Sequence, residues 1–145
     1  YGGPVALKLA AEAPELISGL VLVAAAVDPE LEEMKWYQHV AKVWGVRSLV
    51  PDDLDVCNRE ILLLKGELEK LEKVYSQISL PVEVIQGTSD KLVPKENVDY
   101  LKKHLRQENT NYTVQKGMRH FVPWAFPGLI EDAIVRIHEG SKGSS

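Results

Sequence analysis

Two side chains suited to proton transfer follow two apolar runs of the sequence. Asp90 comes shortly after the run at residues 81–87, and His120 shortly after the run at residues 111–117. Both runs have the composition of strands, and each leads through a loop into a helix. Because the carboxyl ends of parallel strands meet at one edge of an open α/β sheet, we expect the two side chains to lie together there.

A carboxylate beside an imidazole can hold one tautomer of the ring and stabilise its protonated form, which leaves the other nitrogen as a general base. Taken alone, Asp90 is equally typical of a turn or helix cap, and His120 is more typical of a core or loop histidine bonded to backbone. Their matched positions favour an acid–base couple, which needs a nucleophile to complete a catalytic triad. The other histidines, His39, His104 and His138, lie in predicted helices, where we expect them to be solvated.

The rest of the sequence predicts elements that can position this pair. An apolar stripe over residues 5–13 predicts a helix ended by Pro14, and the continuous apolar run at residues 17–26 predicts a strand buried on both faces. The remaining elements are helical by their periodicity and cover residues 30–78, 95–106 and 129–137. This alternation predicts an α/β fold with about three parallel strands and right-handed crossovers.

Composition narrows the possible partners. The chain has 145 residues, of which 45% are hydrophobic, and a net charge of −4, so we expect no nucleic-acid partner. No apolar stretch is long enough to predict a membrane span. The single cysteine, Cys57, excludes an internal disulfide and lies on an apolar helical seam, which favours an inert thiol over a nucleophile. We therefore expect a reducing, cytoplasmic location, and no pattern predicts a metal site or a cofactor.

The start of the chain and the two loops together resemble the α/β-hydrolase superfamily. Its nucleophile lies in Gly-x-Ser-x-Gly, on a strained turn between a strand and a helix. Tyr1 resembles the residue after that serine and Gly2 the closing glycine of the elbow. The loops at residues 87–94 and 117–121 resemble the acid and histidine loops. The family's chain order of serine, acid and histidine agrees with this arrangement.

The resemblance implies a partial α/β-hydrolase fold, the C-terminal part of a serine hydrolase that acts on a small-molecule ester or amide. Asp90 and His120 would be its acid and base, and the Tyr1 N–H would belong to the oxyanion hole. The Gly-x-Ser of the elbow is absent and none of Ser18, Ser48, Ser76 and Ser79 lies in a Gly-flanked turn from strand to helix, so we expect the chain as given to be inactive. The predicted segments are core residues 1–29, a helical cap insertion at residues 30–78, core residues 79–139 and a disordered tail at residues 140–145.

The predicted cap also supplies candidates for a substrate pocket. They are its large apolar and aromatic side chains, Met34, Trp36, Tyr37 and Trp44, although ordinary packing is the better explanation for most of them. A seam of apolar residues with alternating steps of three and four runs over residues 54–75 and is interrupted by Gly66. It could serve a coiled coil, but three imperfect heptads favour packing within the domain.

In the α/β-hydrolase superfamily, the strand that corresponds to the one predicted at residues 18–26 pairs with the strand that precedes the nucleophile. Its edge at residues 19–25 would be exposed in this chain, and an unpaired apolar edge promotes association. We therefore expect a homo-oligomer, most simply a homodimer. The competing function is a non-catalytic, dimerising or ligand-binding α/β module, with Gly2 and Gly3 as a weak anion site. A third is a helical interaction protein that acts through residues 52–75.

Overall fold

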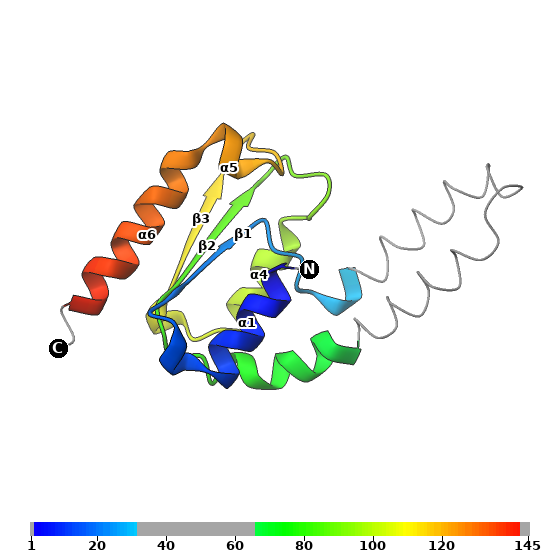
Figure 1. The fold of residues 1–145 in the computed structure, drawn as a ribbon. Coiled ribbons are helices and arrows are strands. Elements are labelled where there is room, and N and C mark those ends of the chain that lie inside the picture. The colour runs from blue at the N-terminus through cyan, green and yellow to red at the C-terminus, as the bar shows by residue number, and fades with distance from the viewer. Residues whose placement is uncertain (1, 32–65, 143–145) are drawn as a thin grey trace, which may run out of the picture.

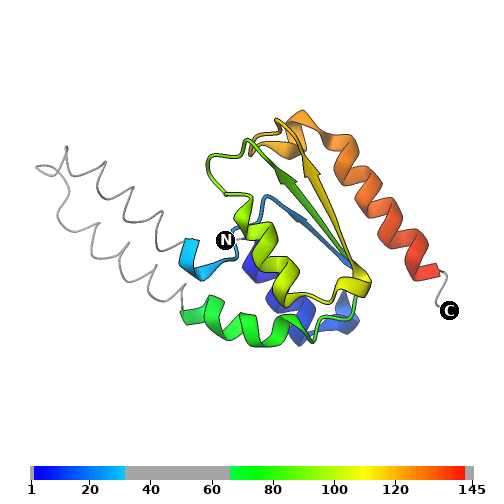
Figure 2. The same cartoon turned by 180° about the vertical axis from the view of Figure 1, so that it is seen from behind.

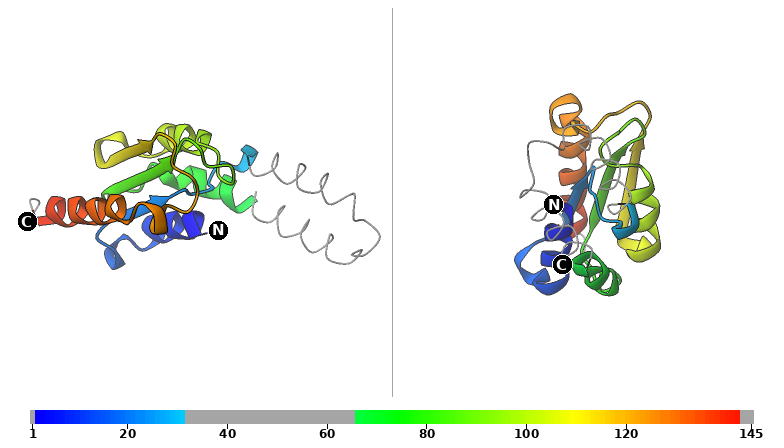
Figure 3. Two further views of the ribbon diagram at one scale, coloured as in Figure 1. Left: turned by 90° about the horizontal axis from the view of Figure 1, so that it is seen from above. Right: turned by 90° about the vertical axis from the view of Figure 1, so that its right-hand side faces the viewer.

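The computed structural model describes residues 2–31 and 66–142, and the side chains of these up to residue 140. Its centre is a three-stranded sheet covered by helices on both faces (Figure 1). Figures 2 and 3 show α4 (Glu96–His104) along one face and α6 (Pro127–Lys142) along the opposite face. Met34, Trp36, Tyr37, His39, Trp44 and Cys57 all lie outside the described residues, as does Tyr1.

The sheet consists of β1 (Leu20–Val23), β2 (Val82–Gly87) and β3 (Thr110–Gln115), in that spatial order. Both pairings are parallel, and Val82 of β2 lies opposite Leu20 of β1 and Thr110 of β3. All three strands therefore end at the same edge, and the loops that follow β2 and β3 are neighbours. This confirms the predicted α/β fold with three parallel strands.

One face of the sheet packs against α1 (Gly2–Glu12), α4 and a helical segment at residues 66–75. The core on this side is aliphatic apart from Tyr75, whose side chain is fully buried. Its main contributors are Leu7, Leu22, Leu68, Leu71, Tyr75, Val84, Val98 and Leu101. The described part of the apolar seam, residues 68–75, thus packs inside the domain, which accounts for its helical spacing without a coiled coil.

The other face packs against α6 and the short helix α5 (Val122–Ala125). Its buried core consists of Ile85, Met118, Val122 and Ala133. At the far end of the sheet, Gly19 lies directly under α6, where an added Cβ would overlap the Ile137 side chain. A glycine is needed there because the strand entry and the helix approach closely.

A charged group lies between β2 and α6. Glu83 is only 2% exposed, and its oxygens accept hydrogen bonds from Arg136 Nη2 at 2.7 Å and Nε at 3.1 Å. Asn111 Nδ2 donates a third bond at 2.9 Å. Burial raises the pKa of Glu83, but the hydrogen bonds from Arg136 and Asn111 outweigh it, so the pKa lies below its usual value. The carboxylate is therefore ionised and paired at neutral pH.

Several element boundaries differ from the sequence prediction. The first strand covers four residues instead of about nine, because Ala24 turns the backbone with a φ of +47°. Two short 3₁₀ helices were not predicted, Pro14–Leu16 before β1 and Gln107–Asn109 before β3. The final helix runs to Lys142 and so enters the segment predicted as a disordered tail. Adding residues to an existing helix costs much less free energy than nucleating a new one.

The expectation that His104 is solvated is wrong. Its ring packs against Tyr100, with 4.4 Å between ring centroids, and its Nδ1 lies 3.6 Å from Glu72 Oε1. The side chain is only 24% exposed because the segment at residues 66–75 lies against α4. His138, in contrast, is exposed on α6. Within residues 2–31 and 66–142, none of the helices has the length and apolar character needed to cross a bilayer.

Candidate active site

The loop after β2 fixes the Asp90 carboxylate. Asp90 Oδ1 accepts hydrogen bonds from the backbone N–H groups of Leu92 and Val93, both at 2.8 Å. The side chain is completely buried. Capping this turn was the simpler interpretation of Asp90 from sequence, and the structure shows that the cap uses only one of the two oxygens. The second oxygen is available for another partner.

That partner is His120, which follows β3. The distance between His120 Nδ1 and Asp90 Oδ2 is 2.8 Å. An ionised carboxylate can only accept, so this bond places a proton on Nδ1 and leaves Nε2 as the basic nitrogen. The imidazole is 32% exposed, so the ring can still contact a reactant while the Asp90 carboxylate is shielded from water. The structure thus brings together the two residues that the sequence singled out.

Backbone hydrogen bonds tie the acid loop to the histidine loop. The N–H of Ser89 donates to the carbonyl of Met118 at 3.0 Å, and the N–H of Gly117 donates to Thr88 Oγ1 at 3.0 Å. Gly117 adopts a φ of +76°, a conformation that favours glycine. Gly87 has no room for a side chain, because a Cβ there would overlap the Met118 carbonyl oxygen. The two loops therefore form one cross-connected unit.

Gln86 is a site residue that the sequence reasoning missed. It is 1% exposed, and its Nε2 lies 3.0 Å from the Val93 carbonyl, 3.3 Å from the Gly87 carbonyl and 3.5 Å from Asp90 Oδ2. The amide thus spans the base of the acid loop and limits how far Asp90 can move. Besides the charged Glu83, Gln86 is the one polar residue in the run at residues 82–86, and its place directly before Gly87 was the available signal.

Asn97 is a second residue that was missed. It is 1% exposed on α4, and its Oδ1 accepts hydrogen bonds from the N–H groups of Val27 at 2.8 Å and Asp28 at 3.0 Å. Its Nδ2 donates to the Pro94 carbonyl at 3.1 Å. One amide therefore joins the chain that leaves β1 to the end of the acid loop.

The beginning of α1 also lies at the carboxyl edge of the sheet. A Cβ on Gly3 would lie 2.7 Å from Ala25 Cβ, so the first turn of α1 is in close contact with the loop after β1 (Figure 1). Gly2 is exposed with open space around it. The glycines at the start of α1, which resemble the end of an elbow, therefore lie at the sheet edge where Asp90 and His120 also lie.

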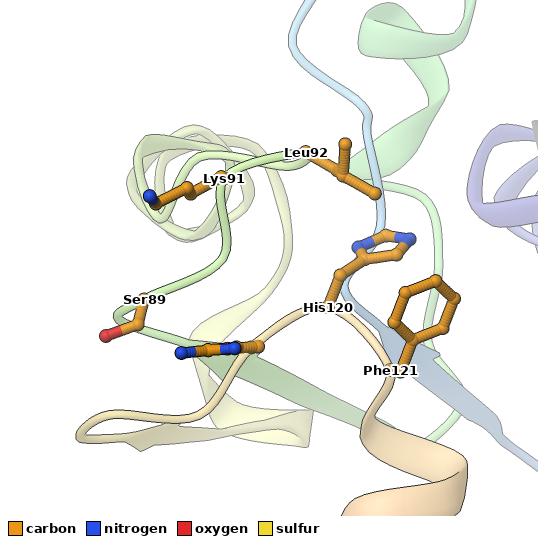
Figure 4. A pocket seen from close by; sticks show the side chains of 6 residues that line it. Ser89, Lys91, Leu92, His120 and Phe121 are labelled. Carbon is orange, nitrogen blue, oxygen red and sulfur yellow. The ribbon is translucent and has the colours of Figure 1, made fainter.

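A cavity of about 330 Å³ opens beside His120. It is lined by Ser89, Lys91, Leu92, Arg119, His120 and Phe121. Figure 4 shows Ser89 and Lys91 along one side, and Leu92 and Phe121 near the imidazole. Phe121 stacks edge-on against His120, with 5.6 Å between ring centroids. In the parts of the chain that the structure describes, no group of three or more His, Cys, Asp or Glu side chains could hold a metal ion.

Comparison with solved structures identifies the fold. No protein-family model and no curated protein matches the sequence. A monoacylglycerol lipase from Paleococcus ferrophilus matches 97% of this chain and 65% of its own, with 18% identity and a TM-score of 0.62. An esterase from Pyrococcus furiosus matches 94% of this chain and 49% of its own, with 17% identity and a TM-score of 0.62.

An α/β hydrolase from a Medee basin deep-sea metagenome library also matches, over 96% of this chain and 62% of its own, with 16% identity and a TM-score of 0.60. The chain thus spans less than two thirds of the length of each of these structures. Sequence identity is low in every case, so the likeness concerns the arrangement of strands and helices. Taken with three parallel strands and loops that converge at their carboxyl edge, it shows that the chain shares the fold of the α/β-hydrolase superfamily.

Proposed function

We propose that Asp90 and His120 are the acid and the general base of a serine hydrolase that cleaves an ester, amide or similar bond of a small molecule. The observation that carries this proposal is the 2.8 Å hydrogen bond between a fully buried carboxylate and a partly exposed imidazole. Solved structures of a lipase and an esterase share the fold, which supports this reaction class. A buried carboxylate with one oxygen on backbone N–H groups is suited to orient the ring without being protonated itself.

The proposed reaction follows from the tautomer. His120 Nε2 takes the proton of a serine hydroxyl as that oxygen attacks the substrate carbonyl, and returns it to the leaving group when the acyl–oxygen or acyl–nitrogen bond breaks. Water then attacks the acyl-serine by the same proton transfers. Asp90 holds the ring in place and stabilises the imidazolium that exists between the two transfers.

We place the nucleophile in a Gly-x-Ser segment that directly precedes Tyr1 in the complete protein. Tyr1 would then supply a backbone N–H to the oxyanion hole, and Gly2 would close the elbow. The close contact between Gly3 and Ala25 supports this placement, because it sets the first turn of α1 at the edge where the acid and histidine loops lie. The sequence predicted a cap over residues 30–78, but Leu68, Leu71 and Tyr75 pack in the core of the domain. We therefore propose a cap that ends before residue 66 and whose Met34, Trp36, Tyr37 and Trp44 line the substrate pocket.

The test compares two lengths of the protein on 4-nitrophenyl acetate. We expect the 145-residue chain to be inactive, and the chain extended by its encoded N-terminal segment to turn over the ester. His120→Ala should abolish that turnover, whereas His138→Ala, on the exposed face of α6, should not. Turnover by the 145-residue chain that depends on His120 would show that the nucleophile lies elsewhere. An extended chain with a Gly-x-Ser that fails to hydrolyse any simple ester or amide would contradict the proposed class.

We also propose that the 145-residue chain forms a homodimer through β1. This strand pairs only with β2 among the described strands, so its second edge is open. Open strand edges present unpaired N–H and C=O groups that favour pairing with another chain.

A further inference from the structure

The cavity beside His120 has two cationic side chains that form no ion pair with a described residue. Lys91 and Arg119 both line it, and none of its described lining residues is a carboxylate. Neither cation lies within salt-bridge distance of a carboxylate in the described part of the chain. The whole chain has a net charge of −4, so a basic composition does not account for the presence of two cations at one cavity.

The carboxylate next in sequence, Asp90, does not neutralise the cavity. Its side chain is fully buried, Oδ2 bonds His120, and Oδ1 accepts the N–H groups of Leu92 and Val93. Asp90 therefore forms no ion pair with Lys91 or Arg119, and its single negative charge offsets at most one of their two positive charges. A cationic pair left open in this way provides ready donors for an anion, and the guanidinium of Arg119 can bind a carboxylate or phosphate with two parallel bonds.

The cavity also has an apolar side. Leu92 is 52% exposed and Phe121 is 63% exposed, although both are large apolar side chains. Figure 4 shows them on either side of His120, away from Ser89 and Lys91. A ligand that fills the cavity would therefore place a short apolar portion against Leu92 and Phe121 and an anionic group between the two cations.

We infer that this cavity selects substrates that carry a carboxylate or phosphate group a few bonds away from the scissile bond, with Lys91 and Arg119 as the residues that bind the anion. This inference rests on the proposed function, since it names a substrate class for the same site. Each cation binds the anion at a partly solvated position, so its removal should weaken recognition about five- to tenfold.

The first experiment measures binding to the 145-residue chain and does not require hydrolysis. Hexanoate, hexyl phosphate and the neutral hexanamide are titrated against the ¹⁵N-labelled chain at low salt. We expect amide shifts at Arg119, His120 and Leu92 with the two anions and much smaller ones with hexanamide. The Lys91→Ala/Arg119→Ala double variant should lose this difference. Lys103→Ala, which removes an exposed cation on α4, should keep it. Equal shifts with hexanoate and hexanamide, or an unchanged response in the double variant, would overturn the inference.

The second experiment uses the extended chain and compares 4-nitrophenyl hemiadipate with neutral 4-nitrophenyl hexanoate. We expect kcat/KM to favour the anionic ester, and the preference to fall about five- to tenfold in Arg119→Ala but not in Lys103→Ala. Hydrolysis without any preference for the anionic ester would contradict the substrate class while leaving the proposed hydrolase standing. Anion binding by the 145-residue chain together with an inactive extended chain would contradict the hydrolase and leave the anion site standing.

Discussion

At the scale of single residues, the site depends on how each polar atom is used. The two oxygens of Asp90 have separate partners, backbone N–H groups for Oδ1 and His120 for Oδ2. Gln86 limits the movement of the same loop from below. This division fixes the carboxylate before any substrate arrives, which is the condition for using it to orient a base.

Asp90→Asn tests whether the carboxylate sets the tautomer of His120. An amide can keep its oxygen on the Leu92 and Val93 N–H groups, but its NH₂ then faces Nδ1 and forces that nitrogen to accept. We expect the ring proton to move from Nδ1 to Nε2, visible in ¹⁵N NMR of the labelled imidazole. In the extended chain, kcat should fall by on the order of 10⁴-fold. Asp99→Asn, on the exposed side of α4, serves as the control. An unchanged tautomer in Asp90→Asn would exclude this role.

At the scale of elements, the strands and loops owe their positions to a few close approaches. Gly87 ends β2 beneath the Met118 carbonyl, and Gly19 precedes β1 beneath α6. The charged group of Glu83, Asn111 and Arg136 joins β2 to β3 and to α6. These contacts determine where the loops of the candidate site begin.

Gly87→Ala should be strongly destabilising. Its Cβ would overlap the Met118 carbonyl oxygen, so the two loops must separate. We expect the free energy of unfolding to fall by roughly 3 kcal/mol, at the upper end for an overpacked site, in urea denaturation. Gly128→Ala is the matched control, since a Cβ at this helical position meets open space and should be neutral or stabilising by up to about 1 kcal/mol. Equal stability of the two variants would argue against the close approach.

Arg136→Met should destabilise the protein by leaving the Glu83 carboxylate buried without its cation. We expect a loss of about 2–3 kcal/mol at pH 7, below the value for a fully buried pair because Arg136 is 46% exposed. In the parent, the lowered pKa of Glu83 means that its contribution is present above the unfolded pKa of about 4.3 and is lost as the pH falls below it.

In Arg136→Met the pKa of Glu83 should instead lie above its unfolded value. This group would then make the folded state more stable on acidification through that range. Urea denaturation at pH 7 and near pH 4.5 measures both effects, with Lys103→Met as a control for loss of an exposed cation. A variant whose pH dependence equals that of the parent would show that the pair does not set this pKa.

At the scale of the whole molecule, the described sheet has two outer strand edges, those of β1 and β3, and the helices α1 and α6 that pack against it carry exposed apolar residues. β1 has a single described neighbour, while Val5 of α1 and Val135 of α6 are 67% and 50% exposed. These surfaces mark the part of the molecule where we expect another chain, or another segment of the complete protein, to pack.

Val21→Pro should weaken self-association without breaking the sheet. The N–H groups of Leu20 and Ala24 donate to the Pro81 and Ile85 carbonyls of the β2 side, so by alternation the N–H of Val21 faces the open edge. Proline removes that donor and is tolerated at such positions. Sedimentation velocity at micromolar concentration should show a dimer for the parent and a monomer for the variant. Lys103→Ala, on the exposed side of α4, should leave the dimer intact. A monomeric parent would refute the proposed dimer.

The sequence predicted those features that depend on periodicity and on fold rules. The parallel α/β sheet and the meeting of Asp90 with His120 follow from strands that alternate with helices and end at one edge. The roles of Gln86, Asn97 and Glu83 could not be predicted in this way, since their contacts depend on which distant groups the packing brings close. Asn97, for example, bonds an N–H that lies 70 residues away in the sequence. The shortness of β1 likewise depends on one backbone angle at Ala24, a residue type that gives no warning of it.

The hydrogen bonds of Asn97 have a consequence for how this fold can vary. They fix residues 27 and 28 to α4, and the helix at residues 66–75 packs in the same core through Leu68 and Leu71. The described residues on both sides of the segment at 32–65 are thus anchored to the core. We expect that this segment can be replaced or lengthened while the hydrogen bond between Asp90 and His120 stays in place.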